Sequence, residues 1–186
     1  MKNEITGMKL RLIVMNFLQF AVWGAYLTSM GTYLFNIGLG AKIGLFYAMQ
    51  GIVSLFMPAI MGIIADRWVP AQKLYGFCHF MAAVFMVAAG WYGYVDGEAV
   101  NFGTLFTFYS LSVAFYMPTL ALTNSVAYTA LDKVKLDPVI AFPPIRIFGT
   151  IGFICSMLLT DILGFQNNYM QFFSCCLLYT SDAADE

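Results

Sequence analysis

Residues 43–73 read IGLFYAMQGIVSLFMPAIMGIIADRWVPAQK, in which the uncharged apolar run Ile43–Ala65 ends abruptly at Asp66 and Arg67. A helix needs about 20 consecutive apolar residues to cross the ~30 Å hydrocarbon core of a bilayer. The run is long enough, and the charges that follow it are costly to place in lipid. This stretch therefore predicts a membrane-spanning helix that leads into a loop at one membrane face.

The whole chain has the composition of a membrane protein. Its 186 residues are 61% hydrophobic and only 10% charged, whereas a soluble domain carries roughly a quarter charged residues. A small domain has too much surface to hide this much apolar area in one core. The net charge of −1 gives no sign of a nucleic-acid partner. The four cysteines have neither metal-site nor disulfide spacing, so no metal is expected.

Five segments pass the length criterion for a membrane span, and a sixth begins near Tyr169 before the sequence turns polar. The five are Leu12–Phe35, Ile43–Ala65, Leu74–Val95, Phe102–Leu131 and Ile145–Leu163. Pro118 is expected to kink the fourth. The connections are short, which favours antiparallel helix hairpins and leaves no extramembrane domain for catalysis. The predicted fold class is an all-α, polytopic membrane helix bundle whose function lies among its helices.

The basic residues are distributed unevenly between the two sides of these spans. Of the nine Lys and Arg residues, all except Lys42 fall in regions that share one side of the membrane when the spans alternate. Cytoplasmic loops carry the excess of Lys and Arg in membrane proteins. The amino terminus is therefore predicted to be cytoplasmic.

The loop after the second span contains a candidate conformational motif. Gly62 permits close helix approach, and Asp66 and Arg67 could pair with neighbouring helix ends and lock one conformation. The alternative is a solvated loop with ordinary interfacial charges.

Polar side chains inside the spans are candidates for a binding cavity. Asn16, Gln19 and Trp23 share one face of the first span, where they either line a wet cavity or form interhelical hydrogen bonds. Asn124 follows a proline in the fourth span and either satisfies freed backbone groups or contacts a ligand. His79 in the third span is either a proton relay or a packed, hydrogen-bonded residue.

Arg146 stands at the start of the fifth span, directly after two prolines. The helix begins either at Pro138, after the N-cap residue Asp137 and with a break at the later prolines, or at Pro143. A cation in a first helical turn opposes the helix dipole, so Arg146 is poorly placed as a mere interfacial anchor. Its guanidinium either reaches a cavity or snorkels to the membrane surface.

Thr150 and Phe153 follow Arg146 at i+4 and i+7 on the same helix face. A guanidinium, a hydroxyl and an aromatic ring on one face are suited to bind a polar ligand that contains a ring.

Four segments resemble one family. They read LQFAVWGAYLTSMGTYLF, SLFMPAIMGIIADRWV, YMPTLALTNSVAY and FPPIRIFGTIGF, and they closely resemble the bacterial nucleoside:proton symporters, or nucleoside permeases, of the major facilitator superfamily. Gly62, Asp66 and Arg67 also match the loop motif of that superfamily, G-x-x-x-D-R-x-G-R-[RK]. Val69 and Pro70 replace its second glycine and second arginine.

The resemblance implies a carrier of twelve spans in two six-helix halves, of which this chain is the amino-terminal half, truncated in its sixth helix. It implies nucleoside:proton symport by alternating access across the bacterial cytoplasmic (inner) membrane, with the proton as coupling ion and no cofactor. Arg146, Thr150 and Phe153 match positions that line the nucleoside site of the family. The expected partners are the nucleoside, the lipid bilayer and the missing carboxy-terminal half.

The resemblance covers most of residues 9–165, and residues 1–175 are predicted to form the transmembrane half. The final segment, 176–186, contains LLYTSDAADE, which resembles a translated sequencing-library adapter and is expected to be non-native.

Three other classes of protein compete with this interpretation. The closest is a major facilitator permease for sugars or other polar metabolites. An integral-membrane enzyme needs clustered His, Asp or Glu residues, which one histidine and scattered acids do not provide, so no enzymatic activity is expected. The third is a scaffold subunit that transports nothing.

Overall fold

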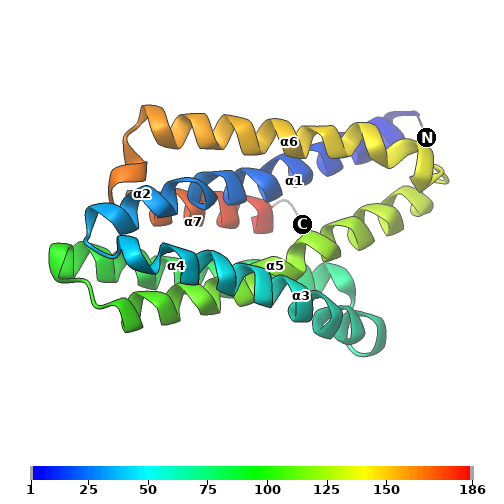
Figure 1. The fold of residues 1–186 in the computed structure, drawn as a ribbon. Helices are drawn as coiled ribbons and strands as arrows, with labels where there is room; N and C mark the ends of the chain where they lie inside the picture. The colour runs from blue at the N-terminus through cyan, green and yellow to red at the C-terminus, as the bar shows by residue number, and fades with distance from the viewer. Residues whose placement is uncertain (1, 185–186) are drawn as a thin grey trace.

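The computed structural model describes residues 2–184, and it places only the backbone of residues 2, 3, 98, 177 and 179–184. Within this range the chain is all-helical, with seven α-helices joined by short turns (Figure 1). They are α1 (Lys2–Leu27), α2 (Ser29–Asn36), α3 (Ile43–Arg67), α4 (Ala71–Asp96), α5 (Phe102–Lys133), α6 (Pro138–Ile162) and α7 (Met170–Ala184). Three single 3₁₀ turns connect them at Gly40–Lys42, Gly97–Ala99 and Phe165–Asn167.

Five helical segments of the described chain are long and apolar enough to cross a membrane, which confirms the predicted number. The first comprises α1 and α2, and the others correspond to α3, α4, α5 and α6. The boundary predicted after residue 175 falls inside α7. The side chains of 177 and 179–186 lie outside the described residues, so the adapter origin of this tail stays a prediction.

The fifth span begins at Pro138, the earlier of the two starts that the sequence left open. Asp137 caps it, because its Oδ1 accepts a hydrogen bond from the Val139 backbone N–H at 2.9 Å. The expected break at Pro143 and Pro144 is wrong, since α6 runs through both prolines. The two prolines remove backbone donors only near the helix start, close to the exposed residues Val139 and Ile140.

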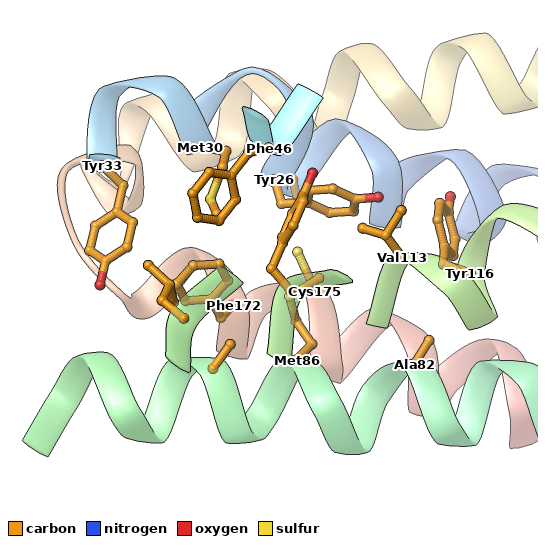
Figure 2. Packing of buried hydrophobic residues seen from close by; sticks show 14 of the residues in the cluster. Tyr26, Met30, Tyr33, Phe46, Ala82, Met86, Val113, Tyr116, Phe172 and Cys175 are labelled. Atoms are coloured by element: carbon orange, nitrogen blue, oxygen red, sulfur yellow. The ribbon is translucent and has the colours of Figure 1, made fainter. Parts of the chain in front are cut away.

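The helices pack as a bundle in which α1 is central. It lies along α6 on one side and contacts α7 and α5 on the other, while α4 packs on α5 and α7, and α3 packs on α5 (Figure 1). The larger of two buried clusters brings together rings from five helices, α1, α2, α3, α5 and α7. Figure 2 shows Tyr26, Phe46, Tyr116 and Phe172 turned toward this shared core. T-shaped ring pairs, such as Tyr26 with Tyr116 at 6.2 Å, hold it together.

Glycines allow α1 and α6 to approach until their backbones touch. A Cβ at Gly152 would overlap the backbone carbonyl of Phe17, and a Cβ at Gly24 would overlap the backbone carbonyl of Phe153. Lipid tails are as apolar as leucine, so helices associate in a membrane through close van der Waals packing of small residues. Gly152 and Gly24 therefore set the spacing of this helix pair.

Large apolar side chains cover the outer surfaces of α3 and α6. Leu55 on α3 is 71% exposed, and Ile162 on α6 is 79% exposed. Such surfaces are unsuited to water but are expected for helices that face lipid or another membrane helix.

We expect Gly152→Ala to destabilise the bundle by about 1–3 kcal/mol, because the new methyl group forces α1 and α6 apart. Thermal melting of the chain in detergent measures the loss. Gly51→Ala on α3 is the matched control, since a Cβ there meets nothing within 4 Å. Equal melting temperatures for the two variants would contradict the close-packed α1–α6 contact.

Candidate functional site

Arg146 lies two turns into α6 and is directed at α1. Its guanidinium carbon is 3.8 Å from the centroid of the Phe20 ring, a close cation–π contact. Arg146 is partly buried, and among the described residues it makes no hydrogen bond or ion pair. Its N–H donors are therefore available to a ligand.

Gly149 provides the space that this contact needs. A Cβ at this position would lie 2.6 Å from Cδ2 of Phe20 and 2.9 Å from Nη1 of Arg146. The guanidinium therefore crosses the bare backbone of α6 to reach the ring on α1. Phe20 is not predicted from the sequence, because the contact joins residues on different helices and a single sequence carries no signal of that pairing.

Trp23 and Phe153 extend the cluster along the same helix pair. Their rings form a T-shaped contact at 6.0 Å, and Trp23 lies 6.3 Å from Phe20. The indole Nε1 of Trp23 is buried and has no hydrogen-bond partner in the described part of the chain. We call Arg146, Phe20, Trp23 and Phe153 the α1–α6 cluster. It combines one cation, three rings and an unused indole donor.

Thr150 and Asn124 are less closely tied to this cluster. Thr150 is exposed one turn after Arg146 on α6, whereas Asn124 is partly buried on α5. Among the described residues, neither Thr150 nor Asn124 forms a hydrogen bond with Arg146. The nearby hydroxyl of Thr123 donates to the carbonyl of Thr119, within its own helix.

Gln19 is fully buried at a polar junction of three helices. Its Nε2 donates to Oγ1 of Thr119 at 2.8 Å, and its Oε1 accepts from the Tyr75 hydroxyl at 2.8 Å. Nε2 of His79 lies 2.8 Å from the same Oε1, and the Tyr116 hydroxyl donates to the Gln19 carbonyl at 2.6 Å. In this structure Gln19 forms interhelical hydrogen bonds, one of the two roles that the sequence allowed, and these bonds connect α1 to α4 and α5.

The direction of these bonds assigns the tautomer of His79. Thr119 Oγ1 donates to the Tyr116 carbonyl at 2.6 Å, so it accepts from the Gln19 amide, which fixes the orientation of that amide. Gln19 Oε1 has no hydrogen to give, and His79 must therefore carry its proton on Nε2. His79 is fully buried in this network, as the packed alternative requires.

The loop motif lies apart from both polar clusters. Asp66 and Arg67 are exposed at the end of α3, and neither makes an ion pair among the described residues. Gly62 is open, since a Cβ there meets nothing within 4 Å. The described residues contain no group of His, Cys, Asp or Glu able to hold a metal.

The all-helical bundle, with five helical segments able to cross a membrane in its described part, has the major facilitator fold. The sequence model of the family described as "Nucleoside H+ symporter" matches residues 6–180. The chain therefore belongs to the nucleoside:proton symporter family.

Similar proteins support this assignment. The chain is 40% identical to the xanthosine permease of Escherichia coli over 88% of its length, and 39% identical to the nucleoside permease NupG of the same organism over 90%. A crystal structure of the nucleoside transporter NupG superposes with a TM-score of 0.87 over 96% of the chain, at 37% identity. The chain covers 38–43% of these proteins, about two fifths of their length.

We expect Gln19→Leu to destabilise the bundle by roughly 1–2 kcal/mol, because it leaves buried donors of Tyr75 and His79 without their acceptor. Unfolding in mixed detergent micelles measures this loss. Gln72→Leu, at an exposed position of α4, is the control. A Gln19→Leu protein as stable as the control would show that the hydrogen bonds of Gln19 do not contribute to the stability of the bundle.

Proposed function

We propose that this chain is the amino-terminal half of a nucleoside:proton symporter in the bacterial cytoplasmic membrane. The observation that carries the proposal is the open guanidinium of Arg146, held inside a bundle of the nucleoside:proton symporter family. The complete carrier, meaning this chain joined to a second half, moves the nucleoside by alternating access around a site between the halves. The partners are then the nucleoside, the bilayer and that second half.

Each residue of the site has a chemical role in this proposal. Arg146 donates hydrogen bonds to the nucleoside, and Thr150 adds a hydroxyl one turn away. Phe153 packs against the ribose or base, and Trp23 offers its unused indole donor. Such a mixture of apolar walls and few polar groups is typical of small-molecule sites.

The two amides have different roles. Asn124 contributes a polar contact from α5. Gln19, whose amide is already engaged on α4 and α5, supports the site by holding α1 in place. Gly62, Asp66 and Arg67 belong to the last turns of α3, and the two charged side chains pair with neighbouring helix ends in one conformation of the carrier.

The proton is the coupling ion, and no other cofactor is needed. Among the described residues, Asp66, Asp96 and Asp161 lie at or near the ends of α3, α4 and α6 rather than in the middle of a span. A group that carries a proton through the membrane must be sheltered from both surfaces. We therefore assign proton carriage to the second half of the carrier.

We expect Arg146→Ala in the complete carrier to weaken nucleoside binding at least about tenfold, the loss typical of a hydrogen bond to a charged group. Calorimetry with uridine measures the affinity, and membrane fractionation checks insertion. Lys73→Ala, at an exposed position, is the control. Unchanged affinity in Arg146→Ala would contradict the assigned site.

Competition uptake identifies the substrate class. Excess unlabelled uridine should block uptake of labelled uridine by the complete carrier, and a dissipated proton gradient should abolish accumulation. Inhibition by a sugar but not by uridine would overturn the nucleoside assignment and favour a permease for sugars.

The orientation is tested with single cysteines in a carrier whose native cysteines are replaced by alanine. In intact cells, an impermeant maleimide should label Ala99→Cys, between α4 and α5, but not Lys133→Cys, at the end of α5. This follows from the excess of basic residues on the Lys133 side. The opposite labelling pattern would place the amino terminus outside.

A further inference from the structure

Phe20 is the one side chain of the α1–α6 cluster that no expected role explains. It is buried, and its ring lies 3.8 Å from the guanidinium carbon of Arg146. At this distance the flat cation is in van der Waals contact with the negative face of the ring. The N–H groups of Arg146 have no other partner among the described residues, so this ring is the contact that holds the guanidinium.

The position of Phe20 is itself fixed by the neighbouring residue. Gln19 is tied to α5 through Tyr116 and Thr119, and to α4 through Tyr75. These bonds involve both the backbone and the side chain of Gln19, so α1 cannot rotate or slide at this level without breaking them. The Phe20 ring consequently faces α6 from a rigid support.

An arginine in a membrane span has an alternative to this position. Its long side chain can extend toward the headgroups, where the charge is hydrated. Ordering it inside the bundle costs side-chain entropy and hydration. A ring already in place offsets part of that cost, because a cation–π contact strengthens when it is shielded from water.

We propose that Phe20 is a positioning residue, whose ring holds the Arg146 guanidinium by one face so that its N–H edge is presented to the nucleoside. The inference rests on the proposed function. The five donors of a guanidinium lie in its plane, and a ring against its face leaves that edge open. Gly149 is part of the arrangement, because any side chain there would separate ring and cation.

The test measures uridine affinity by calorimetry in the complete carrier and in four variants. Phe20→Leu and Phe20→Met fill a similar volume without a ring, whereas Phe20→Tyr keeps the aromatic face. Phe17→Leu is the matched control on the same helix, since Phe17 contacts α6 through its backbone carbonyl. Melting temperatures separate lost packing from lost positioning.

We expect Phe20→Leu and Phe20→Met to weaken uridine binding roughly 5- to 30-fold, as the loss of a shielded cation–π contact implies. Phe20→Tyr should stay within about twofold of the unmodified carrier, and Phe17→Leu should not change affinity. Either ringless variant is sufficient if the other does not fold. A purely structural role would lower the melting temperature and leave affinity intact in folded variants.

Three results would overturn the proposal. The first is that the ringless variants bind uridine as tightly as the unmodified carrier, and the second is that Phe20→Tyr loses as much affinity as Phe20→Leu. Either result removes the positioning role and leaves the nucleoside assignment intact. Failure of the unmodified carrier to bind any nucleoside would overturn both proposals together.

Discussion

The contact of α1 with α6, backbone against backbone, is the constraint on which the site depends. Gly152 meets the carbonyl of Phe17, and Gly24 meets the carbonyl of Phe153. Helices in lipid gain little from hiding apolar surface from each other, so a pair needs shape complementarity to associate tightly. This approach brings Arg146 within reach of the Phe20 ring, and Trp23 within reach of Phe153.

The bundle contains two kinds of polar residue, which differ in how completely they are bonded. Gln19 has its amide nitrogen, amide oxygen and backbone carbonyl all engaged by residues of neighbouring helices. Water is absent from the bilayer core, so a buried amide must find its partners in the protein. Arg146 instead contacts a ring and keeps its N–H groups open.

The residue that anchors α1 and the residue that contacts Arg146 are neighbours in the chain. Gln19 anchors α1 to α4 and α5, and the next residue, Phe20, faces Arg146 on α6. A rigid connection therefore runs from one side of the bundle to the other. The hydrogen bonds of Gln19 therefore hold α1, α4 and α5 together at the level where α1 meets α6.

The sequence by itself determined the all-helical class and the five spans, and it predicted Arg146, Trp23 and Phe153 as candidate site residues. Span length, apolar composition and residue type are local properties, and each can be read from consecutive positions. Only the tertiary structure decided that α6 begins at Pro138, that Gln19 hydrogen-bonds to α4 and α5, and that the Phe20 ring lies against Arg146. These outcomes depend on which helices contact one another and at which level along their axes. Contacts between residues far apart in the chain leave no periodic trace in a single sequence.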